Sequence, residues 1–437
     1  MYKETSLLCG WGRYPKVYSE KIIPQSVGET VLNVKNAQYI LPIGNLRSYG
    51  DSALNERVLV MTGLRRFLSF NESTGVLHCE SGVLLSDIID TFLPRGWFLP
   101  VTPGTKFITV GGAVASDVHG KNHHRDGCFS NFVDEIELVM PDGSIENCSR
   151  SKNSELFYAT CGGMGLTGAI LTVKFRLVRV GSSKIKRIMY RTRNLQDTFA
   201  LFEVIDKLHY SVAWVDCLSG GKNLGRSLVI AGDFADDGEY QIKKKIGLTV
   251  PVDLPRSVLN KYIVRLFNRI YYMKSIVSGA EKFVDHDTFF YPLDFINEWN
   301  RIYGRNGFVQ YQFILPKEKS YDGLEEILTK IGRTGKGSFL AVLKLYGKEN
   351  RNYLSFPMEG YSLALDFKVE RGVFDFLSSL DEIVLRNGGR IYLTKDSRMS
   401  KDVFARGYHK ADFFRKLRKE LGMKEKFTSL QSRRLDI

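Results

Sequence analysis

The segment 103–124, PGTKFITVGGAVASDVHGKNHH, combines the residue types of an anion-binding loop with a group of histidines. Its four glycines are Gly104, Gly111, Gly112 and Gly120. Because glycine has no Cβ, the N–H groups of such a loop can point directly at phosphate oxygens and form an anion-binding nest. A glycine-rich hairpin would explain the glycines but not His119, His123 and His124. The pattern therefore predicts a phosphate cradle with a polar wall.

Two further glycine-bearing segments lie upstream and downstream, LPIGNLRSYGD at 41–51 and GGMGLTG at 162–168. No G-x-x-x-x-G-K-[ST] loop occurs, and no G-x-G-x-x-G leads from a strand into a helix. The run 169–175 after the third loop has a β-type apolar pattern, which disfavours a Rossmann unit. Three such loops indicate one extended ligand threaded between strands, such as a dinucleotide.

Lys395, in the run TKDSR at 394–398, has the chemistry of an acid–base group and follows an expected strand at 389–394. A partly desolvated ammonium can orient a hydroxyl, stabilise a developing alkoxide or, with a lowered pKa, accept a proton. A lysine at a strand end is more often an exposed residue, so its interpretation depends on the surrounding motif.

The three loops resemble those of the vanillyl-alcohol-oxidase-type FAD flavoproteins. More narrowly, the chain resembles the decaprenylphosphoryl-ribose 2′-oxidase family, the flavin half of a two-enzyme 2′-epimerase. The resemblance covers most of the chain and is weakest over 235–285. Its specific motifs are HGKNHH and TKDSR, whereas the glycine loops alone would indicate only some FAD oxidase. It continues through GWGR at 10–13, FYPLD at 290–294, QYQF at 310–313, LSFP at 354–357, GGRIY at 388–392 and RRL at 433–435.

The resemblance implies an α+β, two-domain FAD-binding fold of the PCMH type with an antiparallel-sheet substrate-binding cap domain. The expected parts are an FAD-binding domain at 1–180, a cap at 181–389, and a segment 390–437 that returns to the FAD domain. A chain of 437 residues can hold two domains. Between 181 and 389, strands alternate with helices, which is the pattern of an antiparallel sheet covered by helices.

FAD is the cofactor that the resemblance implies, and we expect it to be noncovalent. Many relatives in the wider superfamily attach FAD through a histidine in the first loop, where this chain has Arg47, Ser48 and Tyr49. His119 remains a formal candidate for attachment, but the narrower family binds FAD without a bond. The residues expected to contact FAD are Pro42, Ile43, Gly44, Asn45, Leu46, Arg47, Ser48, Tyr49, Gly50, Asp51, Ser52, Gly104, Thr109, Val110, Gly111, Gly112, Ser116, Asp117, Val118, His119, Gly165, Ile170 and Tyr392.

The same resemblance assigns catalytic roles to Lys395 and His119. Without it, His119 could equally be a core histidine bonded to a backbone carbonyl, and each aromatic residue could simply pack in the core. No metal site is expected, because no acidic or cysteine ligands share the spacing of His123 and His124. The residues expected to bind substrate are Tyr49, Lys121, Trp214, Gln312, Lys344 and Lys395.

Composition agrees with a soluble globular enzyme, with 43% hydrophobic and 25% charged residues. Six cysteines are scattered without C-x-x-C spacing, which favours reduced thiols and a cytoplasmic location. The N-terminus lacks an apolar h-region, so no secretory signal is expected. The net charge of +14 suggests an anionic partner, and with nucleic-acid motifs absent we expect anionic lipid or a phosphorylated substrate.

Two basic, amphipathic stretches could contact a membrane surface. Residues 258–278 are rich in aromatic residues and carry only basic charges, with Lys261, Arg265 and Arg269 spaced as on one helical face and Lys274 beyond them. Residues 410–422 place Phe413, Phe414, Leu417 and Leu421 on one expected face. The alternative for both stretches is a packed helix with a solvated basic face.

By resemblance, the expected reaction is oxidation of the 2′-hydroxyl of a polyprenyl-phosphate-linked ribofuranose to the 2′-keto sugar. A separate NADH-dependent short-chain reductase would then complete epimerisation to the arabinose. The alternative is an alditol- or aldonolactone-type FAD oxidase that acts on a free sugar. We expect a cytoplasmic enzyme that associates peripherally with an anionic membrane surface and binds no nucleic acid.

Overall fold

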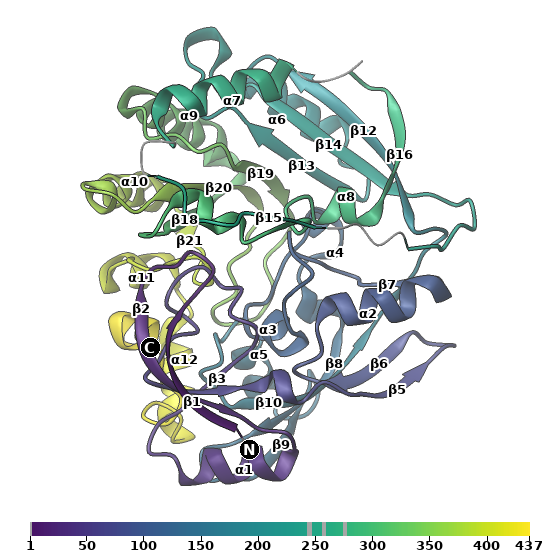
Figure 1. Cartoon of the computed structure of the whole chain (residues 1–437), viewed down its shortest axis with the longest axis vertical. Coiled ribbons are helices and arrows are strands. Elements are labelled where there is room, and N and C mark those ends of the chain that lie inside the picture. The colour runs from purple at the N-terminus through teal and green to yellow at the C-terminus, as the bar shows by residue number, and fades with distance from the viewer. Residues whose placement is uncertain (1, 243–246, 256–258, 274–277) are drawn as a thin grey trace.

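The computed structural model describes residues 2–242, 247–255, 259–273 and 278–437 (Figure 1). Two sheets form the lower part of the view in Figure 1 and a larger sheet the upper part. The smaller of the two lower sheets has the order β1 (Tyr2–Cys9), β2 (Lys16–Ile23), β4 (Arg57–Val60), β3 (Leu41–Ile43). Its neighbour has the order β5 (Phe67–Asn71), β6 (Val76–Glu80), β10 (Ala169–Arg176), β8 (Val133–Val139), β9 (Ile145–Cys148).

Helices connect and cover these two sheets. The first, α1 (Val27–Asn36), begins where Ser26 Oγ accepts the N–H of Glu29 at 3.2 Å, and it joins the strands β2 and β3. The others in this part are α2 (Leu85–Phe92), α3 (Val110–Ala115), α4 (His123–Asp126) and α5 (Ser154–Thr160). The apolar face of α2 is buried through Leu85, Ile88, Ile89 and Phe92. One continuous core therefore joins α1, α2, α3 and α5 to the five-stranded sheet.

The chain enters an eight-stranded antiparallel sheet after β11 (Val178–Arg179), which pairs with β7 (Trp97–Phe98). The predicted antiparallel sheet covered by helices is confirmed, whereas the boundaries at 180 and 389 stay predictions. The order of the large sheet is β16 (Glu281–Asp285), β12 (Lys184–Thr192), β14 (Ser227–Phe234), β13 (Tyr210–Val215), β19 (Ala341–Tyr346), β20 (Gly360–Lys368), β18 (Phe308–Pro316), β21 (Arg390–Ile391).

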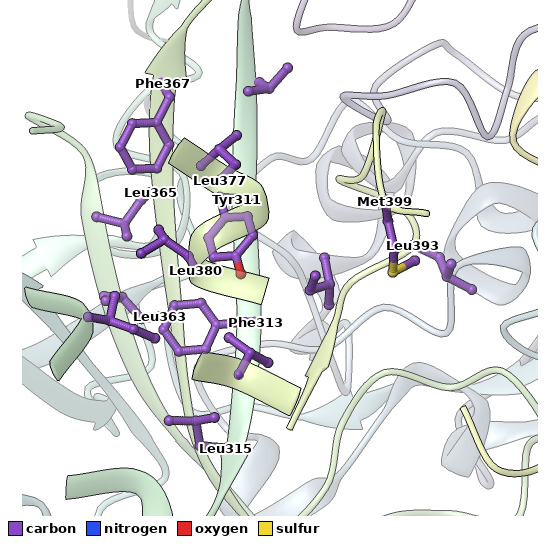
Figure 2. Packing of buried hydrophobic residues seen from close by; sticks show 14 of the residues in the cluster. Tyr311, Phe313, Leu315, Leu363, Leu365, Phe367, Leu377, Leu380, Leu393 and Met399 are labelled. Carbon is purple, nitrogen blue, oxygen red and sulfur yellow. The ribbon is translucent and has the colours of Figure 1, made fainter. Parts of the chain in front are cut away.

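One face of this sheet packs against α6 (Leu195–Val204), α9 (Lys317–Thr334) and α10 (Val373–Arg386). Figure 2 shows alternate residues of β18 and β20 pointing toward Leu377 and Leu380 of α10. These residues are Tyr311, Phe313, Leu315, Leu363, Leu365 and Phe367. Because side chains alternate along a strand, the intervening residues of β18 and β20 face the opposite side, toward the N-terminal half of the chain.

Three C-terminal helices complete the molecule beside β1 to β4 (Figure 1): α11 (Lys401–Gly407), α12 (Ala411–Glu420) and α13 (Leu430–Leu435). The backbone N–H of Leu430 donates to the carbonyl of Leu54 at 2.8 Å, and that of Ile40 to Lys426 at 2.8 Å. The expected apolar face of 410–422 does not pack as a unit, because Phe414 is buried whereas Phe413 is 64% exposed. Arg418 is instead fully buried and donates to four backbone carbonyls.

The strand expected over 389–394 is shorter in the structure, where β21 covers only Arg390–Ile391. The backbone then turns, since the N–H groups of Lys395 and Asp396 both donate to the carbonyl of Tyr392 at 3.1 Å. Because of this turn, Lys395 lies outside the sheet.

Candidate active site

The three glycine-bearing segments converge in the structure. Asn45 Nδ2 donates to the carbonyl of Phe107 at 2.8 Å, which ties the first segment to the second. A Cβ on Gly44 would lie 2.3 Å from Thr109 Oγ1, so these segments touch where only glycine fits. The N–H of Met164, in the third segment, donates to the carbonyl of Ala115 in the second at 2.9 Å. The segments that were predicted to bind one extended ligand thus surround a common region.

A short helix, α3, begins inside the second segment, which the glycine pattern did not predict. Gly111 and Gly112 disfavour a helix by intrinsic propensity. Thr109 Oγ1 accepts the N–H of Gly112 at 3.1 Å and caps the helix locally. Tertiary contacts compensate further, because the N–H groups of Val110 and Gly111 donate to the carbonyls of Val83 and Ser81, each at 2.8 Å.

The region has unsatisfied polar atoms of the kind that a bound dinucleotide would engage. Ser48 Oγ and His119 Nδ1 are buried and have no hydrogen-bond partner among the described residues. Buried polar atoms are nearly always paired in folded proteins, so both atoms call for a partner from outside the chain. With the glycine-lined backbone, these groups fit FAD, which the segments 41–52 and 104–119 would hold.

Lys395 lies against the ring of Tyr49 in the first glycine segment. Its Nζ is 3.6 Å from the ring centroid, which is a cation–π contact. Burial is the main cause that lowers the pKa of Lys395, to about 7. The positive charge of Lys344 also lowers this pKa, whereas the carboxylate of Asp366 raises it. A substantial share of the amine is therefore neutral near pH 7 and able to accept a proton.

The contact between Tyr49 and Lys395 is fixed by the backbone around it. The N–H of Tyr49 donates to the carbonyl of Thr394 at 3.1 Å. A Cβ on Gly50 would lie 1.7 Å from the carbonyl oxygen of Asp396, so the two segments could not approach this closely with any other residue at position 50. Lys395 and the first glycine segment are thus held in one register.

Arg434, near the C-terminus, clamps the same two segments. Its guanidinium donates to the Asp51 carboxylate at 2.8 and 3.0 Å and to Asp396 at 2.8 Å. The sequence interpretation placed Asp51 among the FAD contacts, but its side chain is engaged by Arg434. The role of Arg434 was missed, although the RRL motif at 433–435 was its visible signal.

His119 is buried in a ring of aromatic side chains formed by Tyr346, Phe356 and Tyr392. Its Nε2 lies 3.2 Å from Nε2 of Gln312. Burial, with the charges of Lys344, His123 and Lys395, holds the pKa of His119 well below its usual value. The ring is therefore neutral, and can orient a ligand but does not supply a positive charge.

The other two histidines are used structurally. His123 Nδ1 accepts the N–H of Gly347 at 3.1 Å, and burial lowers the pKa of His123 to about 3. His124 Nε2 contacts the carbonyl of Leu208 at 3.0 Å. Within the described parts of the chain, no three histidine, cysteine or acidic side chains are grouped as metal ligands.

The expected substrate residues of the cap share one face of the eight-stranded sheet. Trp214 is opposite Val342, which is opposite Ala364, and Ala364 is opposite Gln312. Directly opposed residues in antiparallel strands point to the same face, so Trp214 and Gln312 lie on one side. Lys344 is opposite Ser362 and belongs to this same side. We call this side, which bears Trp214, Gln312 and Lys344, the polar face.

Lys121 and Asp117 come from the N-terminal half, and Tyr392 reaches the same region from the turn after β21. Lys121 Nζ donates to the carbonyl of Phe290 at 3.0 Å, and burial together with Lys344 lowers the pKa of Lys121 to about 7. Tyr392 OH donates to the carbonyl of Ser116 at 3.0 Å and packs beside His119. The Asp117 carboxylate accepts hydrogen bonds from Asn350, Asn352 and Ser355 and from a backbone N–H, so a cofactor contact there would use its backbone.

One polar-face residue was missed entirely. Asp366 lies in β20 directly opposite Gln310 of β18, and its carboxylate accepts a hydrogen bond from Gln310 Nε2 at 2.7 Å. The only signal in the sequence was an acidic residue within the apolar run YSLALDF at 361–367.

Comparison with known proteins agrees with this geometry. A family model described as an FAD binding domain matches residues 23–149. A decaprenylphosphoryl-beta-D-ribose oxidase of Mycolicibacterium smegmatis is 34% identical over 454 residues, covering 99% of this chain and 98% of that protein. This chain belongs to the decaprenylphosphoryl-ribose oxidase family. It is an FAD-dependent oxidoreductase with the α+β fold of the PCMH-type flavoproteins.

One further relative has no function in its name, and another matches a smaller part of this chain. An uncharacterised protein of Streptomyces coelicolor is 30% identical over 81% of this chain and its own full length. The mouse L-gulonolactone oxidase is 28% identical over only 38% of each chain. The similarity to free-sugar oxidases is thus limited to part of the chain, and the alternative expectation of such an oxidase is the weaker one.

Proposed function

We propose that this member of the decaprenylphosphoryl-ribose oxidase family oxidises the 2′-hydroxyl of a polyprenyl-phosphate-linked ribofuranose to the 2′-keto sugar. The observation that carries the proposal is the contact of the Lys395 amine, whose pKa burial lowers to about 7, with Tyr49 at the junction of the first glycine segment and the polar face. The end-to-end similarity to a relative named for this substrate supports the choice of sugar and lipid.

The chain supplies the proton chemistry of this oxidation. When bound, FAD supplies the hydride acceptor. The neutral amine of Lys395 accepts the hydroxyl proton, and the face of the Tyr49 ring stabilises the ammonium that results. Gln312 and the neutral His119 ring offer hydrogen bonds that orient the pentose. Lys344, whose pKa burial lowers to about 8, keeps positive charge near pH 7 for the phosphate of the substrate, and Lys121 offers a hydrogen-bond donor beside it.

FAD is held without a covalent bond in this proposal. The first cofactor segment, where other flavoproteins carry an attachment histidine, has Ser48 and Tyr49. The ring of His119 is enclosed by aromatic side chains and lies against Gln312. These contacts explain its position without a bond to FAD.

We further propose that the enzyme works in the cytoplasm at an anionic membrane surface. Helix α7 (Lys261–Met273) is anchored through Val264 and Asn268 and presents an apolar outer face. On this face, Tyr262 is 69% exposed, Leu266 59% and Met273 63%. The exposed Lys261, Arg265 and Arg269 lie beside it, as in an interfacial helix that meets anionic lipid. Lys274, the fourth basic residue of this expectation, lies outside the described residues.

The mode of membrane contact in the proposal is peripheral. Within the described ranges, none of the helices combines the length and the apolar character that crossing a bilayer requires. The 2′-keto product would pass to an NADH-dependent short-chain reductase, because a keto sugar needs a hydride donor to become the epimer. Such a partner need only share the membrane surface on which the lipid-linked product remains.

The proposed reaction is tested by anaerobic mixing of the purified holoenzyme with a short-chain prenyl-phosphoryl ribose. We expect bleaching of the flavin absorbance and a product that is two hydrogens lighter by mass spectrometry. Reduction of that product with borodeuteride should place deuterium at C2. Equal or faster bleaching by free ribose or an aldonolactone would instead support the free-sugar oxidase.

A further inference from the structure

A cavity of about 330 Å³ lies beneath the first turn of α7. Lys261 and Val264 of this helix form part of its wall, and Tyr303 and Asp366 form another part. Among the described residues that line it, none belongs to the sets expected to bind FAD or substrate. The cavity reaches the surface at Lys261 and Glu370, which are both exposed. It is therefore separate from the groups that carry the proposed oxidation.

The loop 334–338, TGKGS, joins α9 to β19 and lines this cavity with all five of its residues. Gly335 ends α9 with a φ of 70°, in the left-handed region that glycine adopts without strain. A Cβ on Gly337 would lie 2.3 Å from Cγ of the buried Leu218, so the loop packs where a larger residue would not fit. The two glycines thus hold Lys336 beside the cavity. Glycines, a lysine and short hydroxyl side chains are typical components of anion-binding loops.

Positive charge exceeds negative charge around the cavity. Its three lysines are Lys261, Lys336 and Lys368. The Glu370 carboxylate is shared by two of them, at 3.2 Å from Lys336 Nζ and 3.4 Å from Lys368 Nζ. Because the Glu370 side chain is 46% exposed, its ion pairs are weak and it can turn toward solvent when another anion enters.

The second acidic residue of the wall, Asp366, adds little negative charge. It is 1% exposed, and its two carboxylate oxygens accept hydrogen bonds from Gln310 Nε2 at 2.7 Å and from the Tyr303 hydroxyl at 3.3 Å. Burial raises the pKa of Asp366 to about 7, against the hydrogen bond from Gln310, which lowers it. The carboxyl is therefore only partly ionised near neutral pH, and the cavity keeps a net positive charge.

The mouth of the cavity adjoins the exposed apolar side of α7. Lys261, at the mouth, is followed directly by Tyr262, which is 69% exposed, and Leu266 one turn later is 59% exposed. Free phosphate would use only the charged cavity. A lipid with an anionic headgroup would use both parts, because its acyl chains can cover these apolar side chains while its phosphate enters between the lysines. The combination therefore favours a lipid.

We propose that the cavity beneath α7 binds the phosphate group of an anionic membrane lipid. The proposal rests on the proposed membrane contact of α7 and involves neither the sugar nor the flavin. Lys336 and Lys368 exchange the Glu370 carboxylate for the phosphate, whose oxygens accept charge-assisted hydrogen bonds from both ammonium groups. Lys261 adds a third positive charge at the mouth. One lipid bound in this way fixes which face of the enzyme meets the bilayer.

The first test measures the melting temperature, Tm, of the holoenzyme at constant ionic strength with increasing dihexanoyl-phosphatidylglycerol, kept below its micelle concentration. A ligand that binds the folded protein raises Tm with concentration, and this dependence gives its dissociation constant. Lys336→Gln should raise that constant by about fivefold, the effect of one basic charge near anionic lipid. Glu370→Gln should lower it, because the competing carboxylate is gone. Wild-type constants in both variants would overturn the proposal.

Parallel titrations identify the source of the phosphate. Inorganic phosphate should bind the wild type more weakly than the short-chain lipid does, because it cannot cover the apolar side of α7. Dihexanoyl-phosphatidylcholine, whose headgroup has no net charge, should raise Tm little. Inorganic phosphate that binds as tightly as the lipid would overturn the assignment to a lipid. An equal rise with phosphatidylcholine would overturn the role of the lysines.

A matched pair of control variants is Lys174→Gln and Glu135→Gln. These two residues form a similar exposed ion pair, with Lys174 Nζ 3.1 Å from the Glu135 carboxylate. They lie in β10 and β8 of the five-stranded sheet and do not line the cavity. Both variants should keep the wild-type dissociation constant. Changes as large as those at Lys336 and Glu370 would show that total charge alone is measured, and would overturn the site.

Sedimentation with phosphatidylglycerol vesicles separates this proposal from the proposed membrane contact. Lys336→Gln should need a higher fraction of anionic lipid than the wild type for half-maximal binding, and Glu370→Gln a lower one. If both variants sediment like the wild type, α7 meets the membrane without the cavity and the proposal is wrong. If no protein sediments although the short-chain lipid gives the expected Tm responses, the headgroup site stands and the proposed membrane contact is wrong.

Discussion

The Lys395 ammonium lies 3.6 Å from the centre of the Tyr49 ring, although the two residues are 346 positions apart in the chain. Arg434 fixes this arrangement by pairing with Asp51 and Asp396, each within two residues of one partner of the contact. Three segments that are distant in sequence therefore meet at Lys395, the proposed catalytic group. These contacts couple the position of the first glycine segment to that of the lysine.

Replacing Lys395 with Ala should leave FAD binding intact and slow flavin reduction by ~10²-fold or more, because the proton acceptor is lost. The measurement is anaerobic stopped-flow bleaching together with the visible spectrum of the bound flavin. Lys416→Ala, on the exposed side of α12, is a control that should reduce at the wild-type rate. Wild-type bleaching in Lys395→Ala would remove the lysine from the mechanism.

The pH dependence of flavin reduction should follow the same amine. In the proposed reaction neutral Lys395 accepts the proton, and burial lowers its pKa to about 7, so the rate should rise with pH and level off above that value. For a lysine with an ordinary pKa, the rise in rate would be centred more than three pH units higher. A profile that is flat from pH 6 to 9 would contradict the assignment of Lys395 as the base.

Denaturing the purified, yellow protein with acid or heat should release intact FAD into the supernatant. The reason is that no histidine or cysteine stands in the first cofactor segment at 41–52. Chromatography of the supernatant measures the released FAD, and the intact mass of the polypeptide detects any flavin that is still attached. Flavin that stays with the precipitated chain would contradict noncovalent binding, and His119 would then be the first residue to examine.

Gly50→Ala should abolish FAD binding or folding, because its Cβ would collide with the carbonyl of Asp396. Gly104→Ala is the informative comparison, since a Cβ there would meet no protein atom within 4 Å. We expect the Gly104 variant to keep the wild-type Tm in the apo form and to bind FAD less tightly. Wild-type FAD affinity in that variant would place Gly104 outside the cofactor site.

Replacing Lys261, Arg265 and Arg269 with Gln should weaken binding to anionic liposomes, with each charge contributing on the order of 1 kcal/mol near the surface. Sedimentation with phosphatidylglycerol vesicles at low and high salt measures the effect. A triple Gln variant of exposed basic residues in the N-terminal part of the chain, Lys35, Arg65 and Lys152, controls for total charge. If the α7 variant sediments like the wild type, this helix is a solvated part of the cap.

Several features of this protein followed from local sequence. The glycine segments, the TKDSR run and the alternation of β18 and β20 are properties of neighbouring residues, because backbone freedom and side-chain period are set locally. The covered antiparallel sheet could be predicted for the same reason. Local signals also failed where tertiary contacts override propensity, as in α3, where the N–H groups of Val110 and Gly111 donate to the carbonyls of Val83 and Ser81.

The active site was decided by the tertiary structure. Strand pairing places Asp366 opposite Gln310, and the turn after β21 brings Lys395 to Tyr49. Asp366 does not stand out in sequence, because an acidic residue in a strand is common, whereas Lys395 was singled out by its TKDSR motif and its partner Tyr49 by the first glycine segment. Burial then changes the chemistry of both groups by removing the water that would otherwise solvate their charges. The sequence supplied the functional groups, and the packing of distant segments determined which of them meet and how readily each holds a proton.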